Sequence, residues 1–133
     1  MSTAERYRAA VERKDLAAVA ELLAQDVVLH SPVTFHPFLG REMVTALLAQ
    51  VIQVFEDFRF TDELSMDGGH ALIFRANVAG SDREIEGIDL LRFDDDELIA
   101  DFTVMLRPMS ALVPFAQAMA ERAQTAGLQT TRA

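Results

Sequence analysis

The spacing of apolar residues changes along the chain, and the change predicts which segments are helices and which are strands. Apolar positions recur every three or four residues over 3–14, 16–25 and 41–55, the spacing of one helix face. A short β-branched run at 27–32 predicts a first strand. Later segments alternate between apolar and polar positions or are short apolar runs bounded by turns, which predicts strands over 58–64, 71–79, 83–94 and 97–107. A closing helix is expected over about 109–126.

This order of elements predicts one α+β domain spanning residues 1–133. Strands joined by short turns pair antiparallel, so we expect a mostly antiparallel, strongly curved sheet. Helices packed on the concave side of such a sheet would enclose a pocket. Its walls should come from the third helix, the inward strand faces and the last helix.

Composition and charge exclude several function classes. With 21 acidic and 12 basic residues the net charge is −9, which repels phosphate backbones, so nucleic acid is not expected as a partner. The chain has no cysteine, which excludes disulfides, thiol nucleophiles and cysteine-based metal centres. No apolar stretch is long enough for a membrane span, and the N-terminal MSTAERYRAA is charged where a signal peptide is apolar. We therefore expect a cytoplasmic protein with no membrane partner.

One acidic residue, in the stretch GIDLLRF, lies on an apolar strand face. Alternation places Asp89 on the same face as Leu91 and Phe93. A carboxylate there must pair with a base, accept several hydrogen bonds, or stay protonated through a raised pKa. Arg75 or Arg107 on a neighbouring strand could supply the base. The sequence leaves these alternatives open.

Two stretches, RYRAAVERKDLAAVAELLAQDVVLHSPVTFHPFLG and IDLLRF, resemble the ketosteroid isomerase branch of the NTF2-like superfamily, which also includes polyketide cyclases of the SnoaL type. The resemblance implies a cone-shaped α+β fold. It also implies that Tyr7 is the oxyanion-hole tyrosine and Asp89 the protonated aspartic acid. Both would donate hydrogen bonds to a carbonyl oxygen as it gains negative charge. The ligand would be a small apolar molecule bearing a carbonyl or phenol oxygen.

The chain departs from this family at the general base. Where the isomerases have an aspartate, before Pro-Val, this sequence has Ser31, and a serine of ordinary acidity cannot remove a proton from carbon. His30 should point to the opposite strand face, whereas His36 lies in the following loop and could reach the pocket mouth. His36 is therefore our candidate for the base, although a surface-loop histidine is the simpler interpretation. The histidines and acids lack the spacing of metal ligands, so no metal site is expected.

Three functions stay open at this point. The protein could be an isomerase, cyclase or dehydratase that works by proton transfer without a cofactor, with His36 or a water held by Ser31 as base. It could instead be a binding protein for a small hydrophobic ligand. A third alternative is a dimeric interaction module, which would fit if Asp89 were paired with arginine. The resemblance also implies a homodimer formed through the outer face of the sheet.

Overall fold

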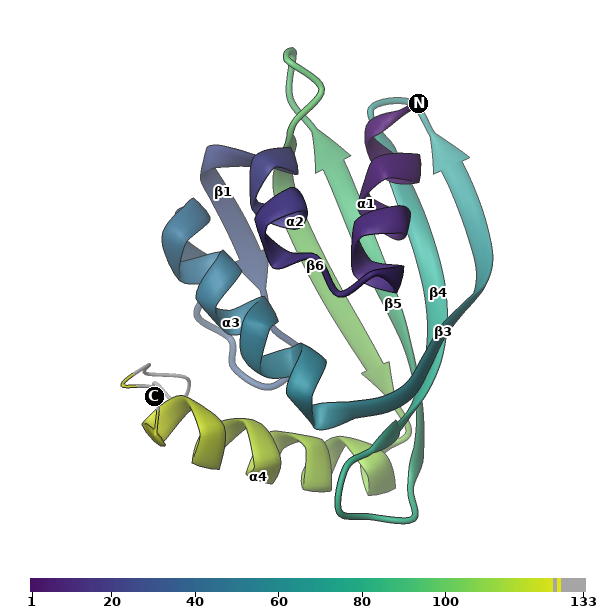
Figure 1. Ribbon diagram of the computed structural model, residues 1–133, viewed down its shortest axis with the longest axis vertical. Coiled ribbons are helices and arrows are strands. Elements are labelled where there is room, and N and C mark those ends of the chain that lie inside the picture. The colour runs from purple at the N-terminus through teal and green to yellow at the C-terminus, as the bar shows by residue number, and fades with distance from the viewer. Residues whose placement is uncertain (126, 128–133) are drawn as a thin grey trace.

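The computed structural model describes residues 1–125 and 127 (Figure 1). Its helices and strands follow one another in this order: α1 (Thr3–Glu12), α2 (Leu16–Leu22), β1 (Leu23–His30), β2 (Phe38–Leu39), α3 (Arg41–Val54), β3 (Phe55–Met66), β4 (Gly69–Val78), β5 (Glu84–Phe93), β6 (Ile99–Arg107) and α4 (Met109–Thr125). The predicted end of the closing helix, at residue 126, lies outside the described residues.

The six strands form one mixed sheet in the order β2-β1-β6-β5-β4-β3. The pair β1 and β6 is parallel and the other neighbouring pairs are antiparallel. Helices α1, α2 and α3 lie on one face of the sheet, and α4 lies across the end where β6 finishes (Figure 1). The α+β class expected from the sequence is confirmed. None of the described helices is long and apolar enough to cross a membrane.

The sequence predicted both N-terminal helix starts through their capping residues. Ser2 and Glu5 form a capping box at α1, since each side chain bonds the backbone of the other. Asp15 caps α2, where its Oδ1 accepts from the backbone N–H of Ala18 at 3.1 Å. The end of α2 was predicted too late, because Leu23 already belongs to β1 and is fully buried there.

Apolar side chains make up most of the layer between the helices and the covered sheet face. Phe55, Phe58, Phe74 and Phe115 form an aromatic cluster with ring centroids 4.8 to 5.8 Å apart. Gly87 on β5 makes room for this cluster, because a Cβ there would collide with the ring of Phe74 and come within 2.6 Å of Leu106 Cδ2. The hydrophobic core therefore lies on the face of the sheet that the helices cover.

Candidate functional site

Strand β5 directs Asp89 toward the helices. Its residues alternate strictly between buried and more exposed positions, and Asp89 is on the buried side with Leu91. On the neighbouring strands it faces Leu72 and Val104. Asp89 is only 6% exposed. Among the residues that the structure describes, no other charged residue is buried. The face predicted from the sequence is thus confirmed.

Tyr7 on α1 is the side-chain partner of Asp89. Its hydroxyl donates a hydrogen bond to Oδ2 of Asp89 at 2.8 Å. Tyr7 is 3% exposed, and its ring packs edge-on against Phe102 with the centroids 5.7 Å apart. A helix near the N-terminus and a strand of the central sheet therefore bring together the two residues that the sequence resemblance paired.

Burial changes the acidity of both groups. Removal from water raises the pKa of Asp89 from 3.8 to about 7, and the hydrogen bond from Tyr7 opposes part of that rise. The pKa of Tyr7 is raised well above its ordinary value, first by burial and then by the neighbouring Asp89 carboxylate. Asp89 can therefore exist in either protonation state near neutral pH, whereas Tyr7 keeps its proton.

The arginines considered as partners for Asp89 lie elsewhere. Arg75 pairs with Glu84 at 2.8 Å and with Glu86 at 3.2 Å, and Arg107 also pairs with Glu86 at 3.2 Å. All of these side chains are on the face of the sheet opposite to Asp89, because they alternate with its inward residues. The interpretation of Asp89 as half of an arginine ion pair is wrong for this structure.

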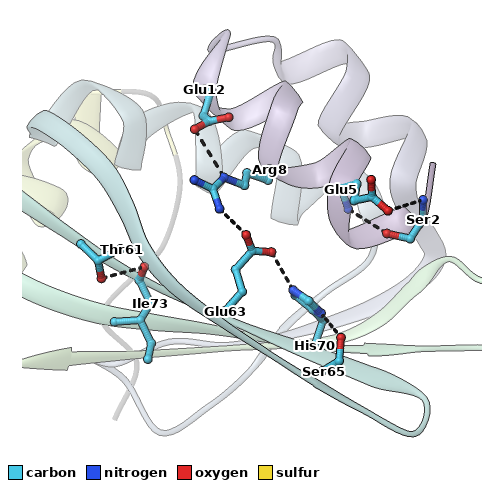
Figure 2. Close-up of polar contacts among 9 residues, drawn as sticks. All are labelled: Ser2, Glu5, Arg8, Glu12, Thr61, Glu63, Ser65, His70 and Ile73. Carbon is cyan, nitrogen blue, oxygen red and sulfur yellow. Dashed lines mark hydrogen bonds and ion pairs between the residues drawn. The ribbon is translucent and has the colours of Figure 1, made fainter.

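A polar network next to Tyr7 ties α1 to the β3–β4 hairpin (Figure 2). Arg8 pairs with Glu12 at 3.4 Å on its own helix and with Glu63 on β3. The other oxygen of Glu63 contacts His70 Nε2 at 2.8 Å, and His70 Nδ1 contacts Ser65 Oγ at 3.0 Å. The guanidinium of Arg8 also lies 5.5 Å from the ring centre of Phe60. These contacts fix the helix that carries Tyr7 over the sheet.

Tyr7 and Asp89 line one cavity of about 410 Å³ between the helices and the sheet. Its other walls are mostly apolar and come from several elements, including Leu29, Val51, Phe55, Phe74, Phe115 and Met119. A volume of this size suits a small organic ligand. The last helix contributes to the wall, as predicted from the sequence.

The remaining predicted site residues do not share one location. Ser31 follows β1, lines the cavity, and accepts a hydrogen bond at Oγ from the backbone N–H of Val33 at 3.0 Å. His36 is exposed, and it is not among the residues that line the cavity. His30 lies on the opposite sheet face, where Nε2 is 3.0 Å from Oδ2 of Asp101. Position therefore favours Ser31 over His36 as a site residue.

Sequence reasoning missed three charged residues at the exposed rim of the cavity. Glu12 and Lys14 belong to the end of α1 and the turn after it, and Asp57 belongs to β3. Asp57 lies at a bulge, where the β3–β4 register shifts, and has a φ of 52°. The only sequence signal was the break in alternation at FEDF. The cavity wall thus contains the buried pair of Tyr7 and Asp89 and three exposed charged side chains.

In the part of the chain that the structure describes, no three His, Cys, Asp or Glu residues are grouped so that they could hold a metal ion.

A model of the SnoaL-like domain matches residues 4–102, which is most of the chain. The protein belongs to the SnoaL-like family. Among solved structures, it is similar to a steroid delta-isomerase from Pseudomonas aeruginosa, with 38% sequence identity and a TM-score of 0.87. That similarity covers 92% of this chain and 90% of the isomerase. The Tyr7–Asp89 pair therefore lies in a chain that is close to a steroid isomerase over nearly its whole length.

Two further structures extend the comparison. A bacterial protein with a cystatin-like fold from Silicibacter pomeroyi shares 32% identity with this SnoaL-like protein, at a TM-score of 0.87, covering 92% of this chain and 86% of that one. An NTF2-like protein from Mesorhizobium loti, at 18% identity and a TM-score of 0.70, covers 80% of this chain and 88% of its own. At this identity, the similarity to the Mesorhizobium loti protein supports the NTF2-like fold but no shared function. A search of curated proteins gave no match.

Proposed function

We propose that the cavity binds a small apolar molecule through a carbonyl or phenol oxygen, and that the protein is a cofactor-independent isomerase, cyclase or dehydratase acting by proton transfer. The observation that carries this proposal is the hydrogen-bonded pair of Tyr7 and Asp89, which is buried and lines a mostly apolar cavity. The similarity to a steroid delta-isomerase supports the same class of ligand.

The pair suits an oxygen atom that gains negative charge. With Asp89 protonated, its O–H and the O–H of Tyr7 are two donors whose oxygens lie 2.8 Å apart. A ligand oxygen that accepts from both replaces the hydrogen bond between them. Because both groups are buried, such donors stabilise an oxyanion more than solvent would, and loss of one typically lowers a rate by about 10² to 10³.

A binding protein without turnover is the second candidate, and Ser31 favours it. By the sequence resemblance, the residue takes the place of the isomerases' base, and its Oγ accepts a hydrogen bond from the backbone N–H of Val33. A protein that kept the oxygen-binding pair and lost the base would still bind the ligand.

A series of phenols and naphthols of graded acidity tests the binding proposal. We expect affinity at neutral pH to rise as the phenol becomes more acidic, because a more acidic phenol places more negative charge on the oxygen. The Tyr7→Phe variant should weaken binding, whereas Asp89→Asn should keep it, since the amide still donates a hydrogen bond. If no member of the series binds, the proposed function is wrong.

We also propose that two copies of the chain associate through the sheet face that the helices leave open. This face carries Met105, which is 49% exposed, beside the charged pairs of Arg75 and Arg107 with Glu84 and Glu86. Opposite charges close together suit a two-fold interface, because each patch is complementary to its own copy.

A further inference from the structure

We propose that Lys14 binds an acidic group at the outer end of the ligand, so that the cavity selects phenols or ketones that also carry a carboxylate. This inference rests on the proposed function, since it takes the ligand's oxygen to be held by Tyr7 and Asp89. It adds the chemical group expected at the far end of the ligand, and it assigns the recognition of that group to one side chain.

Lys14 is the only lysine of the chain, and it lines the cavity. The other basic residues are arginines, and none of those that the structure describes is among the residues that line the cavity. In a protein with a net charge of −9, an anionic ligand needs a local positive charge to offset the repulsion. Lys14 is placed to supply that charge.

The ammonium group of Lys14 is available to a ligand. Its side chain is exposed, and within the described part of the chain it has no acidic partner. Glu12, a neighbour at the rim, pairs instead with Arg8 at 3.4 Å. The carboxylate of Asp57, the third charged group of the rim, accepts a hydrogen bond from Asn77 at 3.3 Å. An anion from the ligand can therefore approach Lys14 without breaking an ion pair of the protein.

The backbone at Lys14 has a conformation that usually belongs to glycine. Its φ is 56°, directly after the C-cap Arg13 of α1. The N–H of Lys14 donates to the C=O of Val11 at 2.9 Å. The N–H of Asp15 donates to the C=O of Ala10 at 2.9 Å, which completes a Schellman motif. Glycine adopts this conformation without strain, whereas a lysine adopts it at a cost in stability. Such a residue points to a use for its side chain.

Lys14 is in line with Tyr7 along the inner side of α1. Tyr7, Val11 and Lys14 follow one another at the i, i+4, i+7 spacing of one helix face, and all three line the cavity. Seven residues of helix rise roughly 10 Å, which is the approximate backbone separation of Tyr7 and Lys14. This wall therefore presents a hydroxyl, an apolar side chain and an ammonium group in that order.

A carboxylate is the ligand group that best fits the outer position. An ammonium group donates hydrogen bonds and accepts none, so the group that it binds must be an acceptor. Hydrogen bonds between ionised partners are stronger than those between neutral ones, which favours a carboxylate over a hydroxyl or an ester. The body between the two ends should be apolar, like most of the cavity wall. We therefore expect a phenolic acid or keto acid with a rigid apolar body.

Two biphenyls that differ in one group test the inference. 4-Phenylphenol has only the phenol, whereas 4′-hydroxybiphenyl-4-carboxylate has a carboxylate at the far end of the second ring. Calorimetric titration at neutral pH gives the affinity of each. We expect the wild type to bind the carboxylate about fivefold more tightly, the upper range for an exposed ion pair.

Variants at and beside Lys14 identify the origin of this preference. Lys14→Gln should abolish it, and Lys14→Arg should keep it. Arg13→Gln is the matched control, because Arg13 is the adjacent cation, pairs with Asp15 at 3.6 Å and is not among the cavity residues. It should leave the preference unchanged. Lys14→Gly should abolish the preference without lowering the urea midpoint, since glycine fits the backbone; a purely structural lysine would instead cost stability when removed.

The single lysine also gives a direct spectroscopic readout. Protein prepared with ¹³C-labelled lysine has one lysine ε-methylene signal. We expect 4′-hydroxybiphenyl-4-carboxylate to shift this signal more than 4-phenylphenol does at equal saturation. Equal shifts would contradict a contact between the carboxylate and Lys14.

The outcomes separate this inference from the proposed function. If 4-phenylphenol binds and the carboxylate binds no more tightly, the inference is wrong and the proposed function stands. If neither compound binds, the proposed function fails, and this inference fails with it. A preference that survives in Lys14→Gln, or that is lost equally in Arg13→Gln, also overturns the inference, because the carboxylate is then recognised by another group or by the general surface charge.

Discussion

The hydroxyl of Tyr7 and the carboxyl of Asp89 are hydrogen-bonded at 2.8 Å although 82 residues separate them in the chain. The bond joins α1 to β5 and is buried from solvent. The bond keeps the Tyr7 hydroxyl, a weakly acidic donor, beside the Asp89 carboxyl, which can be protonated or ionised. The protonation state of Asp89 therefore decides whether the pair has two hydrogen-bond donors or only one.

The stability of the protein should depend on the protonation of Asp89. Its pKa is 3.8 in an ordinary setting and about 7 here, so the folded state binds the proton more tightly than the unfolded state. This contribution is complete below about pH 4 and is lost as pH rises to about 7, a total of about 4 kcal/mol. Asp89→Asn lacks it. Its stability relative to the wild type should therefore rise between pH 4 and pH 8, as measured by urea unfolding at each pH; a constant difference would contradict the raised pKa.

Replacing Tyr7 with Phe should make Asp89 harder to ionise. The Tyr7 hydrogen bond lowers the pKa of Asp89, so its removal should move that pKa above about 7. Phenol affinity should also fall roughly tenfold for the lost hydrogen bond. NMR titration of a labelled Asp89 carboxyl gives the pKa directly. An unchanged or lower value would show that Tyr7 does not stabilise the carboxylate.

Substituting Asp for Ser31 should place a base at the cavity wall. A carboxylate there is less buried than Asp89, so it should ionise at lower pH and speed hydrogen–deuterium exchange at C1 of 2-tetralone, followed by proton NMR in D₂O, down to about pH 5. Ser31→Asn is the matched control, with the same shape and no base. Equal exchange by the two variants at pH 5 would show that this position is out of reach of the ligand.

Gly87→Ala should destabilise the fold by about 1 to 3 kcal/mol through overpacking, because the new Cβ meets the buried ring of Phe74. It should also weaken ligand binding, since Phe74 lines the cavity. Adding Phe74→Leu should recover part of the stability, as measured by thermal unfolding. If the double variant is no more stable than Gly87→Ala, the collision with Phe74 is not the cause.

Association through the open sheet face predicts that Met105→Glu gives a monomer. The side chain is 49% exposed, so the substitution leaves the core intact, and two new charges would face each other across a two-fold interface. Sedimentation velocity should show a dimer for the wild type and a monomer for the variant. A monomeric wild type at high micromolar concentration would overturn the proposed homodimer.

The sequence predicted those parts of the fold that depend on local signals. Ser2 and Asp15 marked helix starts because a cap is read from a few neighbouring residues. Strict alternation along β5 was enough to place Asp89 inward. The parallel pairing of β1 with β6 was not predicted, since it joins segments separated by most of the chain.

The candidate site was predicted only in part for a similar reason. Tyr7 and Asp89 were paired through family resemblance, and no periodic pattern would have joined them. Asp57 was missed because its place at the rim depends on a bulge, which inserts residues and breaks the alternation. His36 was favoured because its loop could have reached the pocket mouth, and the position of a loop side chain cannot be predicted from sequence. In the fold it is not among the residues that line the cavity.

Tyr7 is the only tyrosine of a chain that has no tryptophan. Absorbance in the tyrosine band, at longer wavelength than that of phenylalanine, and the fluorescence excited there therefore arise almost entirely from the ring whose hydroxyl contacts Asp89. Because an ionised carboxylate at hydrogen-bond distance quenches tyrosine emission, the titration of Asp89 can be followed without any label. The natural protein thus carries a single optical reporter in the wall of its own cavity.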